Sequence, residues 1–212
     1  STTAHAAETV PPKSHLIYND MVAARNNPIG LMNLIEVMAR RRLFKPDGLL
    51  LNDTHLSAGP FFDLNPAAAA LGGVIRFKPL AVLQLTESSA WVGYFGTFGL
   101  IQSFDQPDVD YSDTRLGKNE DAGQNYATTG SILKLEGLIQ GKSGPVAFRS
   151  TFLASRYDHN ARGQPHWFDT GLDVMAPTRG WVLKNDVDLL WMDDKGLALG
   201  GRWTWTDPIL GN

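Results

Sequence analysis

Several features are scarce or absent in this sequence, and each absence excludes a class of protein. The 212 residues include no cysteine, which excludes disulfide frameworks, thiolate zinc sites and thiol nucleophiles. Charged residues make up only 19%, and 19 Lys and Arg against 22 Asp and Glu give a net charge of −3. The adjacent basic residues Arg40, Arg41 and Arg42 stand alone, so the clustered positive charge that binds nucleic acid is missing. We expect no nucleic-acid partner.

Long hydrophobic runs are missing as well. The longest stretch free of charged and strongly polar side chains is 90–101, far short of the roughly 20 apolar residues of a membrane-spanning helix. Near the start, Ala4-His5-Ala6 has the A-x-A form cut by signal peptidase. Residues 1–27 are therefore expected to be an N-terminal segment that includes the end of a signal peptide, with an alanine-rich tail as the alternative. A Gly-rich phosphate-binding loop is also missing, and no cofactor is expected.

The sequence is rich in segments where apolar and polar residues alternate with period two, the pattern of half-buried strands. In 180–193, Trp181, Leu183 and Val187 share one face while Lys184, Asp186 and Asp188 share the other. Similar alternation predicts further strands over four other ranges: 132–142, 146–157, 168–176 and 197–206. The class predicted is all-β.

The first half of the sequence is less regular. Strands are expected over 49–58, 73–78 and 81–96. The range 29–44 fits both a strand and an amphipathic helix. We favour the strand because Lys45-Pro46-Asp47-Gly48 would then form a hairpin turn, and the helix stays open.

The predicted connections alternate in length along the chain. Short ones (45–48, 78–79, 142–145 and 177–180) are interleaved with longer ones (59–72, 97–127 and 158–167). Outer-membrane barrels have short turns at one end and long loops at the other. The pattern favours an antiparallel up-and-down barrel of about eight to ten strands over 28–212, either complete or part of a larger barrel.

Two further features favour a membrane barrel over a soluble one. Trp181 and Trp191 are ten residues apart on one face, which spans roughly 23 Å along a tilted strand and matches an apolar band edged by aromatic girdles. Trp203 and Trp205 are expected in the same girdles. The opposite faces carry charged residues that a soluble core would not tolerate and a lumen would: Lys134, Glu136, Arg149, Lys184, Asp186, Asp188 and Arg202.

Over roughly 29–206 the sequence thus resembles an outer-membrane β-barrel protein of Gram-negative type. The resemblance implies the bacterial outer membrane as location, and the lipid bilayer and lipopolysaccharide as surroundings. It also implies a passive role as a pore or a structural barrel, with a protein partner at the extracellular loops or in an outer-membrane complex. A soluble barrel that binds a small ligand is the alternative from another class.

The candidate catalytic and metal-binding residues are few. His55 and Ser57 share a strand face, as in outer-membrane phospholipases, so a lipid-modifying enzyme is a second alternative. An orienting carboxylate or amide is missing near 67–70, and we expect no catalysis. Asp108, Asp110 and Asp113 are weak calcium candidates, since they lack the EF-hand spacing. His159 and His166 are expected at the surface.

Overall fold

The computed structural model describes residues 12–26, 29–45, 48–97, 101–193 and 195–209. Strands make up 67% of the described residues and helices 7%, which confirms the all-β class. Neither described helix is long and apolar enough to cross a membrane.

Nine long strands form one antiparallel sheet in the order β1-β2-β3-β4-β5-β7-β8-β11-β12. Every strand pairs with its neighbour in sequence, except where the small elements β6, β9 and β10 intervene. The strands are β1 (Ser14–Asn26), β2 (Ile29–Arg42), β3 (His55–Asn65), β4 (Ala68–Leu80), β5 (Leu83–Tyr94), β7 (Thr128–Ser143), β8 (Val146–His159), β11 (Arg179–Met192) and β12 (Ala198–Pro208).

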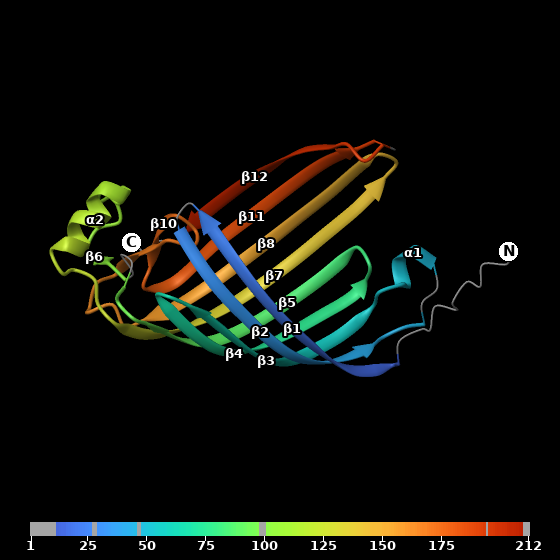
Figure 1. Ribbon diagram of the computed structural model, residues 1–212, viewed down its shortest axis with the longest axis horizontal. Coiled ribbons are helices and arrows are strands. Elements are labelled where there is room, and N and C mark those ends of the chain that lie inside the picture. The colour runs from blue at the N-terminus through green and yellow to red at the C-terminus, as the bar shows by residue number, and fades with distance from the viewer. Residues whose placement is uncertain (1–11, 27–28, 46–47, 98–100, 194, 210–212) are drawn as a thin grey trace.

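The sheet is strongly curved but not closed. In Figure 1, β1 and β2 lie in front of the central strands and run at a steep angle to them. Among the described strands, β1 pairs only with β2 and β12 only with β11. Because each successive pair is antiparallel, the two edge strands β1 and β12 run in the same direction. The predicted barrel is therefore an open sheet here.

The two ends of the sheet differ in their connections. At one end, called the turn end, β4–β5 and β7–β8 are joined by two-residue turns, and a 43–54 segment with the short helix α1 (Gly48–Leu51) joins β2 to β3. At the other end, called the loop end, lie both long connections, 95–127 and 160–178. Figure 1 shows the loop-end elements gathered on the side opposite α1.

The long connections fold into structure of their own. A small antiparallel sheet has the order β10-β9-β6, with β6 (Ser103–Phe104), β9 (His166–Asp169) and β10 (Val174–Pro177), and helix α2 spans Asp113–Asp121. Buried side chains from these connections and from the ends of β8 and β11 pack together as the main hydrophobic core: Ile101, Tyr126, Tyr157, Trp167, Ala176 and Val182.

Most strand predictions are confirmed, including the strand over 29–44, which is β2. The expected loop 59–72 is wrong, because β3 continues to Asn65 and β4 begins at Ala68. The Asn65 side-chain oxygen accepts hydrogen bonds from the backbone N–H groups of Ala67 (3.0 Å) and Ala68 (2.8 Å). These bonds support the tight turn between the two strands.

Three other expectations differ from the structure. The strand over 168–176 is two strands, since Asp169 Oδ1 accepts from the N–H groups of Gly171 (2.8 Å) and Leu172 (3.1 Å) and turns the chain. The strand over 49–58 begins only at His55, after α1. Strand β1 lies before residue 28, where the sheet was expected to begin. Polar and apolar residues occur on both faces of β1, so its sequence shows no clear alternation. Pairing with β2 stabilises the strand.

Candidate functional site

The main sheet has two chemically different faces. One face lines two cavities and is called the inner face; the opposite one is the outer face. Each predicted lumen residue lies on the inner face. The strand register shows this, because residues directly opposite each other on paired strands point to the same face of the sheet. Glu136 lies opposite Leu153, and Leu153 opposite Lys184. Arg149 lies opposite Asp188, and Asp188 opposite Arg202.

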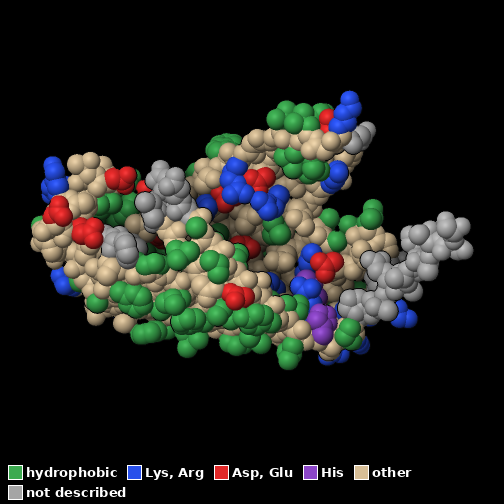
Figure 2. All heavy atoms as spheres, in the orientation of Figure 1, with side chains coloured by type: hydrophobic (Ala, Val, Ile, Leu, Met, Phe, Trp, Pro, Cys, Tyr) green, Lys and Arg blue, Asp and Glu red, His purple; other side chains and the backbone are tan. Residues whose placement is uncertain are grey.

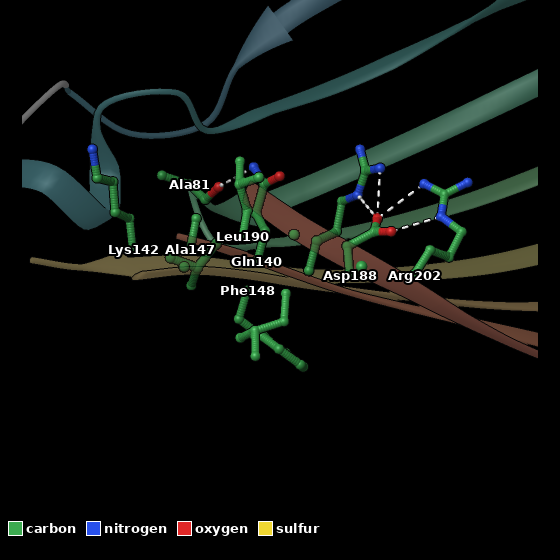
Figure 3. Close-up of a pocket in the computed structure, with 14 residues that line it drawn as sticks. Ala81, Gln140, Lys142, Ala147, Phe148, Asp188, Leu190 and Arg202 are labelled. Atoms are coloured by element: carbon green, nitrogen blue, oxygen red, sulfur yellow. Dashed lines mark hydrogen bonds and ion pairs between the residues drawn. The ribbon is translucent and has the colours of Figure 1, made fainter. Parts of the chain in front are cut away.

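A cavity of about 710 Å³ lies at the turn end of the inner face, between the β4–β5 turn and strands β7, β8, β11 and β12. Asp188 is its central anion (Figure 3). The Arg149 Nη2 atom lies 2.7 Å from Asp188 Oδ2, and the Arg202 Nε atom lies 2.6 Å from Asp188 Oδ1. One carboxylate on β11 thus binds two guanidinium groups from the strands on either side.

A second polar group lies one step deeper, on β11 and β12. The Lys184 ammonium is 3.0 Å from Asp186, and the Thr204 hydroxyl donates to the same carboxylate at 2.6 Å. Across the described ranges, Lys134 and Glu136 make no ion pair; they line the second cavity instead. Five of the seven predicted lumen charges are therefore paired, Arg149, Asp188 and Arg202 across strands and Lys184 with Asp186 along β11.

The second cavity, of about 470 Å³, is lined by β2, β3, β4, β5 and β7. Its strongest interaction is the ion pair between Arg76 and Glu36, with contacts of 2.5 and 3.2 Å. Asp63 also lines it, and its buried Oδ1 atom has no hydrogen-bond partner among the described residues. Sequence reasoning missed these residues. The period-two alternation over 32–40 could have predicted the position of Glu36, because it places this residue on the same strand face as Met32 and Leu34.

His55 and Ser57 lie on the inner face near the turn end, and only 3% and 1% of their surfaces are exposed. Sequence reasoning expected an orienting group only near 67–70 and missed Asp53, whose Oδ1 atom lies 3.3 Å from His55 Nδ1. The Ser57 hydroxyl and His55 Nε2 have no hydrogen-bond partner among the described residues. The pair thus lacks the bond that would activate the serine, and both side chains are closed to solvent.

Asp53 itself lies before β3 and also pairs with Lys78 at 2.5 Å. Partial burial acts to raise the pKa of Asp53, but the hydrogen bond from Lys78 and the positive charges of Lys78, His55 and Arg40 outweigh it. The net effect is a lowered pKa, which keeps this carboxylate ionised.

The expectation that His159 and His166 are surface residues is wrong, because both are buried. The His159 ring lies 4.7 Å from Trp167 and 5.2 Å from Tyr157, measured between ring centroids. Gly130 makes room for it: a Cβ there would lie 2.3 Å from the His159 ring. These aromatic side chains cover the inner face at the loop end.

The weak calcium candidates do not converge on a site. Asp110 accepts a hydrogen bond from the Ser112 N–H at 2.9 Å, which is the main cause of its lowered pKa. Asp113 begins α2. Within the residues that the structure places, no group of three or more His, Asp or Glu side chains could hold a metal ion.

The predicted girdle residues all lie on the outer face. Trp181 and Trp191 are near the two ends of β11, while Trp203 and Trp205 lie opposite Val187 and Asn185, midway between them. Comparisons with protein-family models, curated proteins and solved structures found no match.

Proposed function

We propose that this chain forms the wall of a bacterial outer-membrane β-barrel with a passive, structural or pore-forming role. The supporting observation is the outer face, where large apolar side chains are exposed on nearly every strand. They include Leu16, Val22, Leu31, Val37, Phe62, Leu71, Ile75, Leu85, Trp91, Leu135, Ile139, Phe148, Phe152, Leu189, Leu199 and Trp203. Apolar surface of this extent marks contact with a membrane or another protein.

The charges of the outer face support the same interpretation. Arg41 lies near the turn end, and Arg156, Asp158 and Arg179 lie near the loop end, where a membrane strand meets water. Between them, Asp20 accepts a hydrogen bond from Asn33 at 2.6 Å. Glu87 and Asp207, which lies opposite Leu183, are the other charged residues inside this band among the described residues of the nine strands.

Strand length is adequate for the proposal. Strands β2, β8 and β11 each have 14 residues, whereas about 9–11 residues suffice to cross a bilayer when tilted. A bilayer also requires that the sheet edges be paired, because an unsatisfied backbone group in hydrocarbon is costly. Since β1 and β12 run in the same direction, closure needs either a parallel β1–β12 pair or one additional strand antiparallel to both.

The passive role follows from how the inner face is filled. Ion pairs line the cavity at the turn end, and the aromatic side chains around Trp167 cover the loop end. Small barrels are commonly filled by side chains in this way. The buried His55 and Ser57 give the lipid-modifying alternative no support, and the apolar outer face argues against a soluble ligand-binding barrel.

Site-directed labelling in proteoliposomes tests the proposal. Single cysteines at Leu183, Val187 and Leu189 should react with a membrane-embedded thiol probe, because these side chains face outward. Matched cysteines at Lys184, Asp186 and Asp188 on the same strand should react only with a water-soluble maleimide. Equal reactivity of both sets with the embedded probe, or reaction of the second set alone, would exclude a lipid-facing outer surface.

A further inference from the structure

We propose that the turn-end cavity is a binding site for a small multivalent oxyanion, held by Arg149 and Arg202. The inference goes beyond the passive role proposed above and does not depend on the outer face contacting lipid. It comes from the unused hydrogen-bond donors and the excess positive charge around Asp188.

The two arginines have donors to spare. A guanidinium group carries five N–H donors, and each arginine uses only its Nε and Nη2 atoms on Asp188. The Nη1 groups have no partner in the described part of the chain. The side chains of Arg149 and Arg202 are 47% and 52% exposed, while that of Asp188 is 22% exposed. The donors therefore face the cavity while the carboxylate lies beneath them.

Charge in the cavity is unbalanced. Lys142, Arg149 and Arg202 line it against the single carboxylate of Asp188, in a chain whose net charge is −3. Figure 2 shows Lys and Arg side chains, with Asp or Glu side chains among them, near the centre of the view where the surface is hollowed. The excess positive charge is thus local, as an anion site requires.

The shape and chemistry of the cavity define the ligand class. The two guanidinium groups bond to the same carboxylate, and their free edges match the paired oxygens of phosphate and carboxylate groups. Gln140 adds an amide to the lining. A volume of about 710 Å³ exceeds a single phosphate ion, so we expect a ligand with two or more phosphate or carboxylate groups.

Titration calorimetry with pyrophosphate tests the site. The full chain in zwitterionic detergent micelles at low ionic strength should bind pyrophosphate. Arg149→Gln and Arg202→Gln should each weaken binding about tenfold, the usual effect of losing a hydrogen bond to a charged group. Arg179→Gln is the matched control: it removes the same charge at the loop end, where Arg179 pairs with Asp158, and should leave the affinity unchanged.

A fourth variant separates binding from damage to the fold. Asp188→Asn removes the competing carboxylate, so it should strengthen pyrophosphate binding several-fold, whereas a misfolded cavity would bind more weakly. Absence of binding by the unmodified chain, an equal loss in Arg179→Gln, or weaker binding in an Asp188→Asn variant that unfolds at the same denaturant concentration as the unmodified chain would each overturn the proposal. Failure of the cysteine labelling would not affect it.

Discussion

Glu136 on β7 lies directly opposite Thr86 on β5, so Glu87, the next residue along β5, points to the other face of the sheet. Two glutamates at nearly the same height thus occupy opposite environments. Glu136 lines the inner cavity, while Glu87 lies between Ile75 and Leu135 on the apolar outer face.

This pair provides a matched test of the outer face. In lipid vesicles, Glu87→Leu should raise the free energy of unfolding by about 1–2 kcal/mol, because a carboxylate facing lipid is destabilising. Glu136→Leu should not raise the free energy of unfolding, since Glu136 faces the inner cavity and not lipid. Urea unfolding followed by tryptophan fluorescence measures both. Equal effects from the two substitutions would contradict a lipid-facing position for Glu87.

Gly59 is required by the close approach of β2 and β3. A Cβ atom at this position would lie 1.9 Å from the Val37 carbonyl oxygen, whereas at Gly73 the nearest atom would be 4.0 Å away. Gly59→Ala should therefore cost about 3 kcal/mol or more, or prevent folding. Gly73→Ala should change stability by less than about 0.5 kcal/mol. Similar stability of the two variants in denaturant unfolding would show that the strands separate without cost.

Asp53 should make a small, pH-dependent contribution to stability. Its pKa is lowered in the folded chain, so its contribution is present above the ordinary carboxyl pKa and is lost as the pH falls through the lowered value. Because its side chain is 54% exposed, we expect Asp53→Asn to cost less than about 1 kcal/mol at pH 7. Unfolding at pH 7 and at pH 2 measures the difference, which should vanish at the lower pH. A deficit that persists at pH 2 would assign the effect to packing.

Asp169 fixes the aromatic side chains that cover the inner face at the loop end. Its carboxylate accepts hydrogen bonds from the Tyr157 hydroxyl at 2.7 Å and from two backbone N–H groups of the β9–β10 turn. In planar bilayers the unmodified chain should conduct little current, and Asp169→Ala should increase the leak because these donors lose their acceptor. The exposed Asp158→Ala serves as control. Large, stable current steps from the unmodified chain would contradict a covered lumen.

The sequence predicted the strands whose two faces differ most in polarity. In β11, alternation of Leu183 and Val187 with Lys184 and Asp186 is a local property, and it specifies both the strand and its register. The same reasoning located the charged side chains of the inner face. It could not locate β1, whose alternation is weak and whose stability comes from pairing with β2.

The sequence also could not indicate that side chains distant along the chain would meet. The ion pair of Glu36 with Arg76, and the packing of His159 against Trp167, join residues from different strands and loops. Such contacts depend on how the sheet curves and on how the long connections fold back over its end.

The sequence by itself determined the all-β class, the polar and apolar faces and the positions of most strands, because side chains alternate locally with period two. Only the tertiary structure decided that two arginines share Asp188, that Asp53 reaches His55, and that the sheet leaves β1 and β12 unpaired among the described strands. These features depend on strand order and curvature, which bring together residues that no local pattern connects.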